Sequence, residues 1–195
     1  MSGKAPAGQV VAVTFQGQTV TTGADANGAW KINLPPVTVP GGPFPMIISS
    51  GSEQLTLAYV LIGDIWFCSG QSNMEVPLRV MAPEEVGLAT VPGLRLLKVP
   101  HQASSAPVAA RPASWRACTP STISEFSALA YFFGRDVNRE TGVPVGLIMA
   151  TWGGKRAEVF TRREILLADP VLKPIVDRWD ALMAAYPEAL SIYEI

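Results

Sequence analysis

The first third of the chain alternates apolar and polar residues over short segments that are separated by turn residues. Five segments with strand-forming residues are 10–15, 18–22, 30–34, 45–50 and 54–59, and residues 30–34 show the period of two. Gly17, between the first two, predicts a β-hairpin, and the last two segments predict a second one. Pro40-Gly-Gly-Pro43 is expected to break the chain before that second hairpin. Short strands with regular turn signals predict a small β-sandwich, an accessory domain over residues 1–59.

From residue 60 onward the apolar runs are longer and are joined by a segment with helical periodicity. Three runs predict buried strands: 60–67, 94–99 and 143–151. Residues 124–140 place apolar side chains at helical spacing, with Ser124 as a candidate N-cap and Gly142 as the glycine that ends the helix. A strand, a helix and a strand joined by short connections imply parallel strands. We therefore predict an α/β fold with a parallel sheet and helices over residues 60–195.

Two segments of this second region have weaker patterns. Residues 100–120 are rich in Ala, Ser and Pro and predict a loop that Trp115 anchors. Residues 169–195 carry apolar residues at helical spacing, but Pro174 and Pro187 would kink or interrupt a helix there. An exposed apolar face on this segment would predict aggregation or association.

The composition narrows the classes of partner. The chain has 195 residues, of which 48% are apolar and 16% charged, and its formal net charge is −1. This balance suits a globular core and gives no electrostatic signal for nucleic acid or for an anionic membrane surface. Residues 1–8 lack the apolar stretch of a signal peptide, and no apolar run is long enough to span a bilayer.

The two cysteines, Cys68 and Cys118, lie in no Cys-x-x-Cys or Cys/His spacing, so a zinc site has no support and we predict no metal. We interpret Cys68 as a small buried apolar residue. Pairing of the two cysteines is open at this point, because a sequence does not show that their Cβ atoms meet. The redox compartment is therefore open as well.

The strongest candidate for chemistry is Ser72, which follows the apolar run 60–67 and the small residues Cys68-Ser-Gly. A serine just beyond the carboxyl end of a strand lies where open α/β sheets place their active sites. Its own backbone N–H and a neighbouring one can then point at a developing oxyanion. Met74 occupies the second glycine position of the Gly-x-Ser-x-Gly turn, so this is not the α/β-hydrolase elbow.

Residues 63–74, Gly-Asp-Ile-Trp-Phe-Cys-Ser-Gly-Gln-Ser-Asn-Met, resemble the first sequence block of the sialate O-acetylesterases, a branch of the SGNH (GDSL-like) hydrolases. Two further segments are similar to that family in the same order. They are 28–44, with Gly-Ala-Trp and Gly-Gly-Pro-Phe, and 126–154, which ends in Trp-Gly-Gly. The resemblance runs from about residue 9 to about residue 166. It implies part of the SGNH-hydrolase fold, with a flavodoxin-like parallel sheet. It also implies an esterase without a cofactor that removes O-acetyl groups from carbohydrates, above all from sialic acids.

The resemblance also implies roles for individual residues. Ser72 would be the nucleophile, and its amide would form the oxyanion hole with that of Gly153 or Gly154, the choice between the two being open. The residues placed at the substrate are Gln71, Asn73 and Glu158. Where the family usually reads Thr-Pro, this chain has Lys155 and Arg156, two cations that would suit a carboxylated sugar. Solvated surface cations are the alternative interpretation.

A serine that transfers an acyl group needs an imidazole within hydrogen-bond reach. In the family of the resemblance that histidine comes from an Asp-x-x-His segment, which residues 1–195 do not contain. The one histidine of the chain, His101, matches no family block, and we interpret it as a solvated loop residue. We therefore expect the N-terminal portion of an esterase, with the catalytic histidine and aspartate outside residues 1–195, on a C-terminal fragment that completes the site.

Two alternatives are open. A non-catalytic carbohydrate-binding or interaction module would keep the β region and the glycine turns as a scaffold, with Ser72 unused. An acetylxylan-type esterase would release acetate from xylan rather than from an O-acetylated sialic acid. Members of the family are often secreted, periplasmic or lysosomal, so the start of this chain fits either a cytosolic protein or one whose leader is missing from it.

Overall fold

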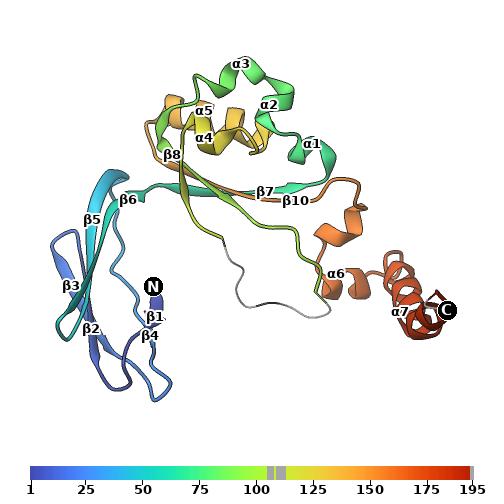
Figure 1. Cartoon of the computed structure of the whole chain (residues 1–195), viewed down its shortest axis with the longest axis horizontal. Helices are drawn as coiled ribbons and strands as arrows, with labels where there is room; N and C mark the ends of the chain where they lie inside the picture. The colour runs from blue at the N-terminus through green and yellow to red at the C-terminus, as the bar shows by residue number, and fades with distance from the viewer. Residues whose placement is uncertain (105–107, 109–112, 194–195) are drawn as a thin grey trace.

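The computed structural model of the chain describes residues 1–104, 108 and 113–193 (Figure 1). Its N-terminal part contains two small antiparallel sheets. The larger has the strand order β3-β2-β5-β6, with β2 Val10–Phe15, β3 Gln18–Gly23, β5 Gly41–Ser50 and β6 Glu53–Ile62. The smaller pairs β1 Ser2–Lys4 with β4 Ala29–Lys31. Trp30 of β4 shares one apolar core with Val11 and Met46 of the larger sheet, so the two sheets form a small sandwich.

Both predicted hairpins are confirmed, because β2 pairs with β3 and β5 pairs with β6. Three details differ from the prediction. Strand β1 was not predicted, and β4 is shorter than the segment 30–34. The segment 40–43 does not break the chain, since β5 begins at Gly41 and continues through Pro43. Proline is tolerated there because the pairing with β6 is irregular, with register shifts between Gly41 and Met46.

The second half of the chain contains a four-stranded sheet of order β7-β10-β8-β9. Its strands are β7 Asp64–Gly70, β8 Val91–Lys98, β9 Arg116–Cys118 and β10 Val145–Thr151. Strand β10 runs parallel to both β7 and β8, whereas β9 is antiparallel to β8. The predicted α/β fold with a parallel sheet is confirmed. The carboxyl ends of β7 and β10 lie side by side, with Thr151 opposite Gly70.

Helix α5, Ala128–Thr141, covers one face of this sheet (Figure 1). The helix approaches the sheet closely because Gly134 has no side chain. A Cβ at this position would lie 2.8 Å from Leu147 Cδ1 and 3.0 Å from Leu94 Cδ1. Both leucines are completely buried. The strand–helix–strand unit is therefore held by an apolar layer between α5 and the central strands β10 and β8.

The predicted start of this helix is wrong, and its predicted end is confirmed. Ser124 follows a separate short helix, α4 Pro120–Ile123, as its C-cap. The N-cap of α5 is Ser127, whose hydroxyl accepts a hydrogen bond from the Ala130 N–H at 3.2 Å. Gly142 closes the helix in the left-handed conformation, with φ of 70°, which glycine adopts without strain.

The apolar run 60–67 is not one buried strand. Its first three residues belong to β6, and Gly63 separates them from β7. Strand β7 lies at the edge of its sheet, and its side chains Ile65, Trp66 and Phe67 are 66%, 43% and 67% exposed. Trp66 lies on the α5 side of the sheet and contacts Phe133 of that helix, whereas Ile65 and Phe67 point to the opposite face. Strand β6 continues past residue 59 to Ile62. The predicted boundary between two domains at residue 59 stays a prediction.

Short helices connect the strands, and a long helix comes last. They are α1 Ser72–Glu75, α2 Leu78–Met81, α3 Pro83–Val86, η1 Ala157–Phe160, α6 Arg163–Ala168 and α7 Lys173–Tyr193. Pro174 lies in the first turn of α7 and Pro187 inside it, and neither interrupts the helix. Trp179 and Leu182 on α7 are 58% and 60% exposed, so the apolar face that favours association is present. No helix in the described part of the chain is long and apolar enough to cross a membrane.

The segment 100–120 is only partly a loop. Residues 105–107 and 109–112 lie outside the described residues. The segment then forms β9 and the start of α4, neither of which was predicted. The expected anchor Trp115 is 43% exposed and packs against the sheet, where its ring would lie 3.1 Å from a Cβ at Gly146.

Both cysteines are free thiols, which answers the question of pairing. Cys68 and Cys118 are 8% and 2% exposed, so the interpretation of Cys68 as a buried apolar residue is confirmed. Burial raises the pKa of the Cys118 thiol to about 11, although a backbone hydrogen bond at Val91 opposes part of this rise. Burial raises the pKa of Cys68 as well.

We expect Cys118 to resist alkylation in the folded protein. The thiolate is the reactive form, and at pH 8 a thiol with a pKa of about 11 is almost entirely protonated as well as buried. Mass spectrometry after treatment with iodoacetamide at pH 8 should find Cys118 unmodified in buffer and fully modified in denaturant. Rapid labelling without denaturant would contradict the buried position of β9.

Candidate active site

Ser72 lies on the turn that follows β7, as the first residue of α1. The turn requires glycine at position 70, where φ is 140° and a Cβ would lie 3.0 Å from Met74 Cγ. Met74 itself packs against the core of the sheet and so anchors α1. Ser72 is exposed, and its Oγ lies 3.5 Å from Oε1 of the neighbouring Gln71. Ser72 is therefore exposed to solvent on a turn that Met74 anchors to the core of the sheet.

The glycine turn after β10 lies directly beside this serine. The Trp152 N–H donates to the Gly70 carbonyl at 3.0 Å, which joins the two strand ends. A Cβ on Gly153 would lie 3.7 Å from the Ser72 Cα. The structure thus brings together the two elements that the sequence singled out, although they are far apart in the chain. Their roles as nucleophile and oxyanion donors stay predictions.

The two glycines of this turn differ in their surroundings. The Gly153 N–H donates a hydrogen bond to Glu75 Oε2, and a Cβ on Gly153 would lie 2.7 Å from the same oxygen. Gly154 adopts the left-handed conformation, with φ of 72°, and a Cβ there would meet nothing within 4 Å. Glycine is therefore favoured at 154 by its backbone conformation, whereas a side chain at 153 would displace the Glu75 carboxylate from the amide.

His101 is an exposed loop residue, as interpreted, but its side chain also makes three contacts that the sequence did not indicate. Its Nε2 lies 2.8 Å from Glu75 Oε1 and 2.8 Å from the Thr151 carbonyl oxygen. Its ring stacks on Trp152 with centroids 4.5 Å apart and planes 5° apart. The side chain is 39% exposed. The loop after β8 therefore enters the region of Ser72 through His101, although no described imidazole is hydrogen-bonded to Ser72 Oγ.

The other residues expected at the substrate lie on elements that follow the two strand ends. Asn73 is exposed on α1, and Glu158 is half-buried in η1. The Lys155 ammonium lies over the Trp152 ring, 5.0 Å from its centroid, in a cation–π contact. Lys155 thus places one positive charge beside the glycine turn, and the predicted substrate roles of these residues stay untested.

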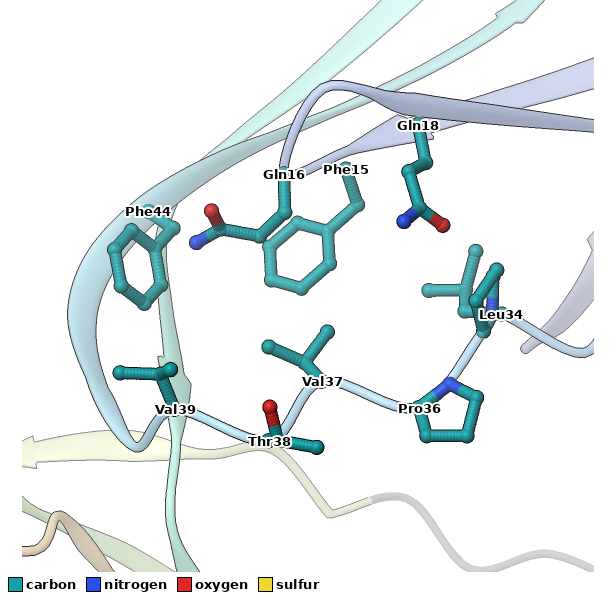
Figure 2. A pocket seen from close by; sticks show the side chains of 10 residues that line it. Phe15, Gln16, Gln18, Leu34, Pro36, Val37, Thr38, Val39 and Phe44 are labelled. Atoms are coloured by element: carbon teal, nitrogen blue, oxygen red, sulfur yellow. The ribbon is translucent and has the colours of Figure 1, made fainter.

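Two cavities lie away from Ser72. One of about 450 Å³ belongs to the N-terminal sandwich, where Phe15, Gln16 and Phe44 face Val37 and Val39 (Figure 2). Another of about 660 Å³ lies between β6 and the amino-terminal ends of β7 and β10, at the end of the sheet opposite Ser72. Among the described residues, no group of His, Cys, Asp or Glu side chains could hold a metal ion. The candidate site is therefore the open surface around Ser72.

No protein-family model matches the chain. The sialate O-acetylesterase of Rattus norvegicus is 31% identical over 183 residues, which cover 83% of this chain and 34% of the rat protein. That of Homo sapiens is 32% identical over 187 residues, which cover 85% of this chain and 36% of the human protein. This chain is a sialate O-acetylesterase homologue. The homologue spans about a third of the length of these relatives.

A solved structure agrees with this relationship. The crystal structure of a carbohydrate acetylesterase from Xanthomonas citri matches the homologue with a TM-score of 0.76 and 37% sequence identity. The match covers 85% of this chain and 38% of the Xanthomonas chain. The sandwich and the parallel sheet of the homologue are therefore part of a larger fold in that enzyme.

Sequence reasoning missed the pairing of Glu75 with His101. Glu75 is the last residue of α1, and its carboxylate accepts the Gly153 N–H. The only signals in the sequence were that a carboxylate follows Ser72 by three residues and that the chain has a single histidine. Neither signal shows that the two side chains meet.

Proposed function

We propose that this chain forms the serine-bearing part of a carbohydrate esterase that hydrolyses O-acetyl esters. The observation that carries the proposal is the position of Ser72, exposed at the carboxyl end of a parallel strand with the Gly153–Gly154 turn beside it. Active sites of open α/β sheets lie at this edge. Backbone amides at such turns supply the donors that an oxyanion requires.

In the proposed reaction Ser72 Oγ attacks the carbonyl carbon of the acetyl ester, and its proton passes to a general base. The amides of Ser72 and of Gly154 donate to the oxyanion that forms, because the Gly153 N–H already donates to Glu75. The sugar hydroxyl then leaves with the proton and the acetyl group remains on Ser72. Water attacks this acyl-enzyme with help from the same base, which releases acetate and restores the serine hydroxyl.

We propose that the base, a histidine with its aspartate, lies outside residues 1–195, on a C-terminal segment that completes the site. The parallel sheet supports this, because sheets of this kind are normally covered on both faces. Among the described residues, helices cover only the face that bears Leu147 (Figure 1). On the other face Phe67, Ile148 and Leu97 lie side by side across three strands, and Phe67 is 67% exposed.

We propose O-acetylated sialic acids as the substrates. The named relatives are sialate O-acetylesterases, and Lys155 beside the glycine turn would suit a carboxylated sugar. Acetyl esters of neutral sugars such as xylan are the second candidate. It is favoured by the Xanthomonas enzyme, whose description names carbohydrate in general.

The test is covalent labelling with a fluorophosphonate, which reacts only with an activated serine. The protein would be treated as residues 1–195 and as the full-length product of its gene, followed by peptide mass spectrometry. We expect labelling at Ser72 in the full-length protein and little or none in residues 1–195, because the base would be missing there.

Failure to label Ser72 in either form would refute the serine-esterase proposal and favour a non-catalytic carbohydrate-binding module. Labelling of residues 1–195 at the full rate would refute the part that places the base elsewhere. Acetate release from O-acetylated sialic acid and from acetylated xylan then separates the two substrate classes.

A further inference from the structure

A hydrogen-bonded network joins three segments around Ser72. Glu75 from α1 accepts the Gly153 N–H on Oε2 and lies 2.8 Å from His101 Nε2 through Oε1. The same Nε2 lies 2.8 Å from the Thr151 carbonyl oxygen. The ring of His101 also stacks on the ring of Trp152, and the backbone N–H of Trp152 donates to the Gly70 carbonyl at the end of β7. The helix after β7, the turn after β10 and the loop after β8 are thus linked through one carboxylate and one imidazole.

The chemistry of these contacts indicates which atoms carry protons. Both partners of His101 Nε2, the Glu75 carboxylate and the Thr151 carbonyl, are acceptors only. Nε2 must therefore carry a hydrogen, and it cannot remove the proton of Ser72. The Gly153 N–H has a single hydrogen, which Glu75 already accepts. The network is therefore suited to holding groups in place rather than to transferring a proton.

We infer that Glu75 and His101 are positioning residues for Ser72. Glu75 ties the Gly153–Gly154 turn to the helix that begins with the serine. His101 holds the Glu75 carboxylate in place, and its hydrogen bond reduces the negative charge of that carboxylate beside the proposed oxyanion. A small displacement of such groups costs a large part of the rate, because the donors must be in place when the oxyanion forms. The inference rests on the proposed esterase function.

The length of the Glu75 side chain lets its carboxylate reach the Gly153 N–H. Glu75 is half-buried, with a side chain 25% exposed, and sits three residues after Ser72 on the same helical turn. A shorter acid would not reach Gly153, and an alanine would leave the Gly153 N–H without its partner. A glutamine keeps one oxygen that can accept this N–H, but its NH₂ group would face the His101 Nε2–H.

The experiment measures kcat and KM for p-nitrophenyl acetate with full-length protein carrying Glu75→Ala, Glu75→Gln or His101→Ala. Glu84→Ala is the matched control, because Glu84 is an exposed acid on α3 outside the network. We expect Glu75→Ala to lower kcat about 10- to 100-fold with KM little changed, and Glu75→Gln to restore part of this loss. We expect His101→Ala to lower kcat to a smaller extent, and Glu84→Ala to leave both constants unchanged.

A second measurement examines the network itself in residues 1–195. The amide proton of Gly153 should resonate far downfield in wild type and move upfield in Glu75→Ala, as judged by ¹H–¹⁵N NMR. An unchanged Gly153 shift would refute the network. An unchanged kcat in Glu75→Ala would refute the positioning role, and an increased kcat would show that Glu75 blocks the amide instead. If wild-type protein hydrolysed no ester, the proposed function would be refuted. The NMR test of the network would still stand, because it does not depend on activity.

Discussion

Replacing Ser72 with alanine is expected to lower acetyl-ester hydrolysis by the full-length protein at least about 10⁴-fold. Without the hydroxyl no acyl-enzyme can form, and removing the nucleophile of a serine hydrolase costs several orders of magnitude in kcat. The free energy of unfolding should change by less than about 0.5 kcal/mol, because Ser72 is exposed and makes only a long contact to Gln71. Steady-state kinetics with an acetylated sugar and a denaturant titration of the same variant measure the two effects.

Ser69→Ala is the matched control for this prediction. Ser69 lies on β7, the strand that leads to Ser72, and its hydroxyl donates to the Ala150 carbonyl at 2.9 Å, which supports the sheet. Its loss should cost about 1 kcal/mol of stability and leave the rate of hydrolysis nearly unchanged. If Ser72→Ala kept its activity while Ser69→Ala lost it, the nucleophile would be assigned to the wrong serine of this segment.

The elements that the sequence predicted well are those whose signals are local. Turn residues between strand-forming segments define the hairpins, and the pairing of Val13 with Val20 and of Ile47 with Thr56 follows from them. The left-handed Gly142 ends α5 where the helical spacing stops. In each case the physical cause lies within a few residues of its effect.

The errors arose where the outcome depends on distant segments. The run 60–67 is apolar throughout, but its burial depends on neighbours, and in the described chain β7 is an edge strand. Ser124 and Ser127 are both suitable N-caps by residue type. Which one caps α5 is decided by the separate short helix that ends at Ile123. Strand β1 has little apolar pattern and exists because it pairs with β4.

The candidate site shows the same division. The proximity of Ser72 and Gly153 could be predicted, because both follow strands of one parallel sheet and parallel strands end at one edge. The contact of His101 with Glu75 could not, since it depends on the path of the loop after β8. A single histidine in a proline-bearing segment carries no sequence signal for the carboxylate that it meets.

Replacing Leu147 with alanine is expected to destabilise the protein by about 2–5 kcal/mol. Leu147 is completely buried in the central strand β10 and faces Gly134, where α5 comes closest to the sheet. Truncation removes apolar contacts and leaves a cavity. Gly134 has no side chain that could fill this cavity, and β10 cannot shift into it because it is paired with β7 and β8. A shift of the denaturation midpoint with an unchanged slope would measure this loss.

Leu129→Ala makes the same chemical change on the exposed side of α5, away from the sheet. Leu129 on α5 is 53% exposed, so its truncation removes little buried surface, and alanine favours the helix slightly. We expect the free energy of unfolding to change by less than about 0.5 kcal/mol. The difference between the two variants therefore measures the layer between α5 and β10, independently of what covers the opposite face. Equal losses of unfolding free energy in the two variants would mean that α5 does not pack on the sheet through this layer. The placement of the glycine turn after β10 would then be wrong as well.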